Sequence, residues 1–170
     1  AKILKLDDKL KAGEYEIKSG ASMRDILASL SSGKSVLHSL TIPEGLTVMQ
    51  ILTRIGENEV LTGDMPADVP PEGSLLADTQ RFSRGTTRAE IIQKLVNDQK
   101  KLVEEVWARR QPDLPIKDVN EFVTLASIVE KETGKADERP RVAGVFVNRL
   151  NKGMRLQSDP TIIYGIYGGR

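Results

Sequence analysis

The stretch Ile42-Pro-Glu-Gly-Leu-Thr-Val-Met-Gln-Ile-Leu52 carries the pattern that decides the fold. Gly45 permits a tight turn, because a residue without a Cβ adopts positive φ angles at little cost. Thr47 can cap the free backbone N–H groups of a following helix, and Gln50 stands where a capping-box partner reaches back. The stretch therefore predicts the end of a strand, a glycine turn and a helix.

The same pattern occurs twice more, in segments that begin at Ile17 and Phe82. The matching turn, cap and third-position residues are Gly20, Ser22 and Asp25, and then Gly85, Thr87 and Glu90. Apolar residues follow each cap at the spacing of one helix face. A unit of this size buries too little apolar surface to fold alone, so we expect the three units to pack onto other parts of the chain.

The flanking segments predict an α+β fold. Segments 14–17 and 36–42 have the composition of strands, and glycine and proline interrupt the chain between Asn58 and Gly73. We therefore predict three parts. They are a small β-α-β-α domain over residues 1–62, a linker or ordered crossover over 63–72, and a mainly helical subdomain over 73–170.

The helical subdomain should contain three longer helices and a short one. Apolar periodicity predicts a helix from Thr87 to about Arg110, where prolines follow. A second helix should run from about Val119 to Thr133 with Asp118 as its cap. The remaining predicted helices run from Pro140 to Asn151 and onward from Pro160.

The composition excludes several classes of function. The chain carries 25 Lys+Arg against 24 Asp+Glu and only 4% aromatic residues, so we expect no nucleic-acid partner. It has no cysteine, and its single histidine, His38, alternates with apolar residues as a strand side chain does. We expect no metal site and no cofactor. No stretch approaches the roughly 18 apolar residues of a membrane span, so we expect any anchor to lie outside this chain.

Glu130 and Glu132 stand at the end of an apolar helix. The expected apolar stripe of that helix consists of Phe122, Leu125, Ala126 and Val129. At about 100° per residue Glu130 lies at the edge of the stripe, where apolar packing favours the protonated form that a general acid needs. Glu132 lies about 200° further round, so the two carboxylates should not share one cleft. A solvated surface glutamate is the alternative reading of Glu130, and periodicity alone does not decide between them.

Four segments follow in order: Leu125-Ala-Ser-Ile-Val-Glu-Lys-Glu-Thr133, Glu138-Arg139, Val142-Ala-Gly-Val-Phe-Val-Asn-Arg-Leu150, and Met154-Arg-Leu-Gln-Ser-Asp-Pro-Thr161 with Tyr164-Gly165. Together they resemble the catalytic core of the endolytic murein transglycosylase (YceG-like) family. Segments 11–17 and 41–47 resemble the LysM-like part of that family. The repeats are also similar to the LysM fold, a module that binds the glycan of peptidoglycan and chitin. Generic α+β packing is the alternative for the repeats alone.

The resemblance implies a lyase that cuts the β-1,4 bond between N-acetylmuramic acid and N-acetylglucosamine inside peptidoglycan strands, leaving a 1,6-anhydro muramyl end. One glutamate serves as acid and then as base. Glu130 matches that glutamate, and Glu132 is the reserve candidate. The residues implied as sugar-binding or supporting groups are Glu72, Glu132, Asn148, Gln157, Ser158, Asp159, Thr161 and Tyr164. A scaffold role is the alternative for each, since Asp159 before Pro160 is a natural helix cap.

The chain departs from the family pattern at one place. It has Glu72-Gly-Ser-Leu-Leu-Ala-Asp-Thr-Gln80 where the family usually has Glu-Gly-Tyr-Leu-Phe-Pro-Asp-Thr-Tyr, so rings that could stack on sugars are absent. The resemblance also implies a single-pass anchor in the inner membrane, outside this chain, and a catalytic part that faces the periplasm. It implies that the catalytic subdomain continues beyond residue 170, and that wall-synthesis complexes are partners.

Two other functions stay open. A non-catalytic module would use the repeats to bind peptidoglycan and position other wall proteins. A hydrolase would pair Glu130 with a second carboxylate such as Glu72 or Asp159, because ordinary glycosidases need two. The mass of the product separates the hydrolase from the lyase, since hydrolysis adds water.

Overall fold

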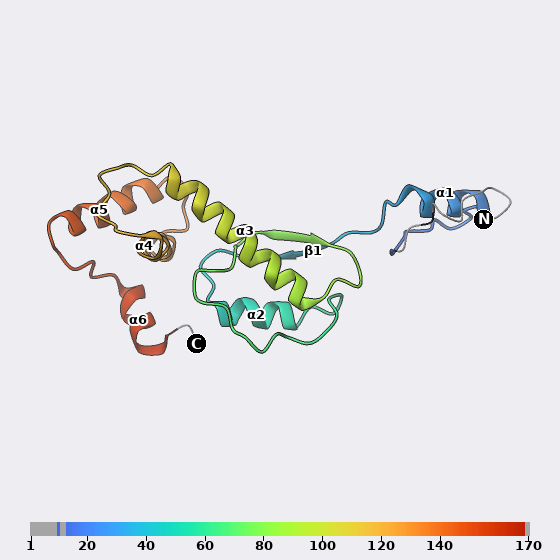
Figure 1. Ribbon diagram of the computed structural model, residues 1–170, viewed down its shortest axis with the longest axis horizontal. Helices are drawn as coiled ribbons and strands as arrows, with labels where there is room; N and C mark the ends of the chain where they lie inside the picture. The colour runs from blue at the N-terminus through green and yellow to red at the C-terminus, as the bar shows by residue number, and fades with distance from the viewer. Residues whose placement is uncertain (1–9, 11–12, 169–170) are drawn as a thin grey trace.

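The computed structural model describes residues 10 and 13–168, and it shows a mixed α+β chain extended along one axis (Figure 1). Residues 1–9, 11–12 and 169–170, which include the predicted start of the first domain, lie outside the described residues. The elements in chain order are α1 (Met23–Ser32), β1 (His38–Thr41), α2 (Val48–Gly56), β2 (Thr79–Phe82), α3 (Arg88–Ala108), α4 (Val119–Glu132), α5 (Arg139–Asn151) and α6 (Asp159–Tyr167). Within this part of the chain, none of the helices has the length and apolar character to cross a membrane.

All three predicted capping boxes are present. They pair Ser22 with Asp25, Thr47 with Gln50 and Thr87 with Glu90. The Ser22 hydroxyl and backbone N–H donate to Asp25 and hold the pKa of that carboxyl below its ordinary value. The backbone N–H of Thr87, and then its hydroxyl, donate to Glu90 and hold the pKa of that carboxyl below its ordinary value. The sequence signal for the starts of α1, α2 and α3 is therefore confirmed.

The first core lies between α2, α3 and the strand pair. β1 runs antiparallel to β2, with His38 opposite Phe82 and Thr41 opposite Thr79. The buried side chains of this core are Leu40, Ile42, Val48, Ile51, Leu52, Ile55, Leu61, Leu75, Phe82, Ile91, Ile92 and Leu95. The second and third repeats therefore share one core, and that core takes residues from both sides of segment 63–72.

The first repeat lies apart from this core. α1 buries none of its residues, and Figure 1 shows it at the end of the molecule remote from α4, α5 and α6. The predicted strand over 14–17 is wrong: the segment is irregular, and the Glu14 carbonyl accepts one hydrogen bond from the Val36 N–H at 2.7 Å. The strand predicted over 36–42 shortens to β1 because β2, its partner, offers four residues.

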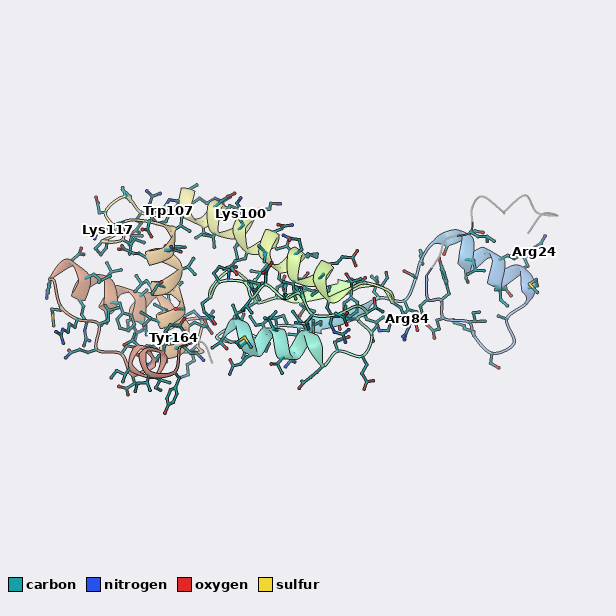
Figure 2. The ribbon with its side chains drawn as sticks, turned by 60° about the horizontal axis from the view of Figure 1, so that its bottom comes forward. Arg24, Arg84, Lys100, Trp107, Lys117 and Tyr164 are labelled. Carbon is teal, nitrogen blue, oxygen red and sulfur yellow. The ribbon has the colours of Figure 1, made fainter. Side chains whose placement is uncertain are left out.

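Glu14 links this N-terminal segment to the first core. Its Oε2 lies 3.0 Å from Arg84 Nε and 2.7 Å from His38 Nε2, and Figure 2 shows Arg84 where the two parts meet. His38 is thus a strand residue engaged by a carboxylate, and its ring stands 6.0 Å from that of Phe82. Hydrogen bonds from Arg84 and then His38 hold the pKa of Glu14 below its ordinary value.

Replacing Glu14 by Gln should loosen this link in a pH-dependent way. A lowered carboxyl pKa means that the contact stabilises the fold above the ordinary value of about 4.3, and that this stability is lost as the pH falls through the lowered pKa. Amide exchange at Val36 should therefore be faster in the variant at pH 7, and the difference from wild type should vanish in strong acid. A difference in exchange rate that persists unchanged in strong acid would show that the charge of Glu14 is irrelevant to this contact.

The second core joins α4 to α5. Ile128, Val129 and Phe146 are buried, and Leu125, Val142, Ala143 and Leu156 pack against them. The predicted helix ends agree with α4 and α5 to within one residue. At the corner between α3 and α4, the Trp107 ring meets the Phe122 ring edge-on at 5.8 Å, and Figure 2 shows Trp107 at this end of α3. This corner sets the direction of the helix that carries Glu130.

Candidate active site

Glu130 lies on the last turn of α4, and its side chain is 25% exposed. The predicted apolar stripe is partly wrong. Ala126 is exposed, and the face that packs on α5 is formed by Leu125, Ile128 and Val129. Glu130 follows directly after the buried Val129, so it still stands at the edge of the apolar face.

Arg139, the first residue of α5, forms an ion pair with Glu130. Its Nη2 lies 2.9 Å from Glu130 Oε2. Its Nε is buried and has no hydrogen-bond partner among the described residues. An unpaired buried donor costs about 1–3 kcal/mol, so this position is held by the surrounding structure. The sequence analysis places Arg139 in a motif but gives it no role.

The turn between α4 and α5 is fixed by a buried hydroxyl. Thr133, which is 9% exposed, donates from Oγ1 to Glu138 Oε2 at 2.9 Å and accepts from the Lys135 N–H at 3.1 Å. The Lys135 ammonium lies 3.2 Å from the other oxygen of Glu138. These contacts determine where the chain enters α5, and hence where Arg139 stands.

Glu132 has a different partner from Glu130. Its Oε1 accepts a hydrogen bond of 2.5 Å from the hydroxyl of Ser158, which is 3% exposed. The bond ties the end of α4 to the start of α6 across 26 positions of sequence. The two carboxylates thus belong to separate clusters, one with Arg139 and one with Ser158.

The start of α6 is held by hydrogen bonds to and from Ser158. Asp159 is the first residue of α6, and Ser158 occupies the cap position, so the alternative reading of Asp159 as the helix cap is wrong. The Ser158 hydroxyl is engaged by Glu132, and the Ser158 carbonyl accepts from the Thr161 hydroxyl at 2.6 Å. Gln157 has a φ of 52°, a left-handed conformation that is costly for a residue with a Cβ.

Three of the remaining predicted residues differ in exposure and partners. Asn148 on α5 is exposed, and Tyr164 on α6 is 50% exposed and visible at the surface in Figure 2. Glu72 supports α2 instead: both of its carboxylate oxygens lie 3.1 Å from the Val48 N–H, at the start of that helix. A carboxylate suits this place because helix N-termini carry partial positive charge.

Two glycine turns of the first core approach α4. A Cβ built on Gly73 would lie 2.8 Å from Val123 Cγ1, and one built on Gly45 would lie 3.6 Å from Lys131 Nζ. Val123 and Glu130 are seven residues apart, so they share one face of α4. The motifs Pro43-Glu44-Gly45 and Glu72-Gly73 therefore lie beside the face that carries Glu130.

Replacing Gly73 by Ala should destabilise the protein by about 1–3 kcal/mol, because it adds a steric clash to a φ of +77°. Combining it with Val123→Ala should recover part of the loss, since the clashing methyl is then removed. Gly85→Ala is the matched control, with a φ of +95° and open space around its Cβ. Equal losses at both glycines, measured by urea unfolding, would contradict the close approach to α4.

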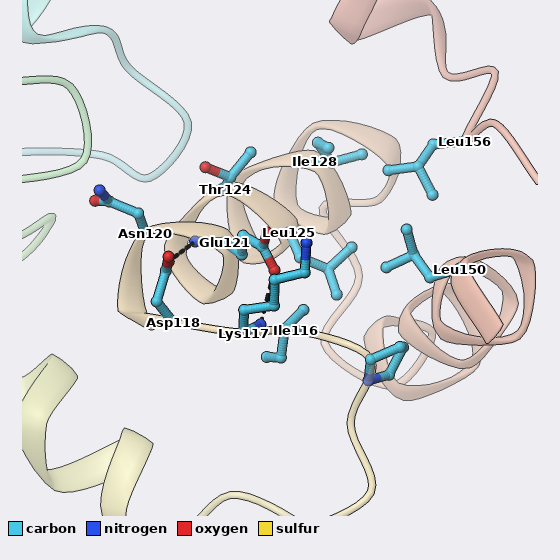
Figure 3. Close-up of a pocket in the computed structure, with 11 residues that line it drawn as sticks. Ile116, Lys117, Asp118, Asn120, Glu121, Thr124, Leu125, Ile128, Leu150 and Leu156 are labelled. Atoms are coloured by element: carbon cyan, nitrogen blue, oxygen red, sulfur yellow. Dashed lines mark hydrogen bonds between the residues drawn. The ribbon is translucent and has the colours of Figure 1, made fainter. Parts of the chain in front are cut away.

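A cavity of about 430 Å³ lies on another side of α4 (Figure 3). Its apolar lining includes Ile116, Leu125, Ile128, Leu150 and Leu156. Its polar side includes Asp118, which accepts from the Glu121 N–H at 2.9 Å, and Glu121, which accepts from the Lys117 N–H at 2.7 Å. Glu130 does not line this cavity, since it lies about 200° around the helix from Ile128.

The fold and the site thus define a class: an α+β chain with one half-buried glutamate, paired to an arginine, at the end of a helix. The model of the YceG-like family matches residues 1–169, and the chain belongs to that family.

Named relatives extend this finding. Proteins called endolytic murein transglycosylase from Streptococcus pneumoniae strains D39 and R6 are 32% identical over 197 residues, covering 91% of this chain and 35% of theirs. The Bacillus subtilis strain 168 protein of the same name is 27% identical over 183 residues, covering 90% of this chain and 51% of its own length. The chain thus spans about a third to a half of these relatives.

A solved structure agrees with the fold. The 2.6 Å crystal structure of a yceG-like protein from Listeria monocytogenes has a TM-score of 0.57 and 28% identity. The match covers 96% of this chain and 64% of that one.

Proposed function

We propose that this chain forms the LysM-like and catalytic region of a peptidoglycan lytic transglycosylase, with Glu130 as its single acid/base. The observation that carries the proposal is the position of Glu130 at the end of α4, half-buried beside an apolar face. The names of the S. pneumoniae and B. subtilis relatives support the reaction class.

The reaction needs only one carboxyl group. Glu130, protonated, gives its proton to the glycosidic oxygen as the bond from C1 of N-acetylmuramic acid breaks. The resulting carboxylate takes the proton of the C6 hydroxyl as O6 of the same sugar attacks C1, so the ring closes to the 1,6-anhydro product and Glu130 regains its proton. Water enters neither bond.

The engagement of other carboxylates supports this single-residue mechanism. Glu132 is hydrogen-bonded to Ser158, and Glu72 to the start of α2. A hydrolase of the ordinary kind needs a second carboxylate about 5–10 Å from the first, free to act as nucleophile or base. We therefore favour the lyase over a hydrolase that uses Glu72 or Glu132 as its second carboxylate, and the mass of the product tests one that uses the exposed Asp159.

The other implied site residues divide into two proposed groups. Those whose polar groups are engaged, and which we propose as supports, are Glu72, Glu132, Ser158 and Thr161. Those exposed to solvent, and which we propose to meet the sugar, are Asn148, Gln157, Asp159 and Tyr164. The left-handed backbone of Gln157 supports its place in this second group, because such strain clusters at functional sites.

The proposed cellular location of the enzyme follows from the proposed substrate. Peptidoglycan lies outside the cytoplasmic membrane, so the chain would act on the periplasmic side, with an inner-membrane anchor and wall-synthesis partners supplied outside it. Residues 1–62 would bind glycan in the manner of LysM modules, and 73–170 would carry the catalytic group.

Digestion of purified peptidoglycan tests the proposal. The protein should release fragments with anhydro-muramyl ends, detected by mass spectrometry as one water lighter than hydrolytic fragments. Binding to sedimented peptidoglycan without any release would instead establish a non-catalytic module. Fragments that carry the extra water would establish a hydrolase.

A further inference from the structure

Arg139 is the one group in the described part of the chain that makes a polar contact with the Glu130 carboxylate. The contact runs through Nη2 to Oε2 at 2.9 Å, and the other carboxylate oxygen, Oε1, has no partner there. A carboxyl with one oxygen held has a fixed plane, and its free oxygen points in a defined direction. On the basis of the proposed function, we infer that Arg139 is a positioning residue for Glu130.

The position of Arg139 is set by the turn before it. The buried Thr133 hydroxyl binds Glu138, and Arg139 is the next residue. A side chain placed in this way is pre-organised, so little freedom is lost when it holds the acid for reaction. The Thr133–Glu138 bond thus fixes the position of Arg139, and through Arg139 it fixes the orientation of the Glu130 carboxylate.

Contact between Arg139 and only one oxygen of Glu130 suits both halves of the proposed reaction. When Glu130 carries its proton on Oε1, Oε2 remains a carbonyl-type oxygen whose partial negative charge still faces Arg139 Nη2. When Glu130 is ionised and acts as base, the guanidinium stabilises its charge. The same contact therefore orients the group before and after it gives up its proton.

The unpaired Nε of Arg139 is consistent with this arrangement. In a guanidinium, Nε–H and one Nη–H point the same way and form a fork that can hold both oxygens of a carboxylate. Here only Nη2 contacts Glu130, and Nε stays buried without a partner. Full use of the fork would take up Oε1, so the half-used fork leaves that oxygen available for proton transfer.

Soluble glycan strands, digested by the purified protein, test this role. Arg139→Gln should lower kcat by about 10- to 100-fold, the cost of misplacing a catalytic group, while KM stays within about twofold. The kcat of Arg139→Lys, which keeps the charge but not the planar fork, should lie between that of the wild type and that of Arg139→Gln. The matched control is Arg141→Gln, an exposed arginine one half-turn further along α5 that should behave as wild type.

Chemical rescue separates positioning from a merely structural role. Added guanidinium, at concentrations that leave the wild type unchanged, should restore part of the activity of Arg139→Ala and none of that of Glu130→Gln. A wild-type kcat in Arg139→Gln would overturn the inference, as would a loss confined to KM. If Arg139→Gln fails to fold by circular dichroism, Arg139→Lys decides, and a wild-type kcat there would overturn the inference, because an ammonium group does not reproduce the placement of Nη2 beside Oε2.

The same set of variants separates the two proposals. An active Glu130→Gln would overturn the proposed function and this inference with it. An inactive Glu130→Gln beside a fully active Arg139→Gln would overturn only the role of Arg139.

Discussion

Replacing Glu130 by Gln should lower the rate of glycan cleavage by about 10²- to 10⁴-fold, the usual contribution of a general acid–base group. Gln matches the shape of Glu and keeps a carbonyl oxygen that can face Arg139, but it can neither donate nor take up the transferred proton. The fold and the binding to sedimented peptidoglycan should therefore be unchanged. Release of anhydro-muropeptides, followed by chromatography, measures the effect.

Two neighbouring variants serve as controls for this experiment. Glu104→Gln, on the solvent face of α3, should have wild-type activity because its carboxylate is 66% exposed. Glu132→Gln removes the reserve candidate and weakens the bond to Ser158, so we expect a smaller loss than at Glu130. A larger loss at Glu132 would transfer the catalytic role to that residue.

Replacing Leu95 by Ala should lower the free energy of unfolding by about 2–5 kcal/mol. Leu95 is 0% exposed in the first core, and α3, which carries it, continues to the corner with α4. Domains of this kind are stable by only about 5–15 kcal/mol, so the variant should unfold at clearly lower urea concentration.

Leu102→Ala is the matched control on the same helix. Leu102 is 44% exposed, so its truncation should cost less than about 1 kcal/mol. Activity measured well below the unfolding midpoint should be unchanged in both variants, because neither leucine touches the proposed site. Equal losses of stability would mean that the first core is not centred on Leu95.

Local signals in the sequence predicted much of this structure. The capping boxes at Ser22, Thr47 and Thr87 depend on residues three positions apart, so the chain itself contains the whole motif. The ends of α4 and α5 were predictable for the same reason, since caps and breakers are local. The α+β class followed from these elements.

Features that depend on distant residues were not predictable. Segment 14–17 has strand-like composition, but it forms no ladder with β1; its Glu14 carbonyl is instead bonded to the Val36 N–H, before that strand begins. Ala126 fits the apolar spacing of α4, yet it is exposed because α5 packs on the neighbouring face. A helix pattern gives the spacing of a face but not which side meets the next helix.

The candidate site likewise combines features that the local sequence predicts with contacts that depend on more distant residues. Glu130 at the edge of an apolar helix face could be predicted from periodicity and from family resemblance. Its contact with Arg139 depends on the six-residue turn between α4 and α5, and on the Thr133–Glu138 bond within it. The support of α2 by Glu72 joins residues 24 positions apart, a contact that no local pattern reveals.

Digestion in ¹⁸O-labelled water tests the single-carboxyl mechanism most directly. The account predicts that wild-type protein releases anhydro-muramyl ends that contain no label, because O6 of the sugar closes the new bond, and that Glu130→Gln releases none. Labelled reducing ends, or equal release by wild type and Glu130→Gln, would contradict it.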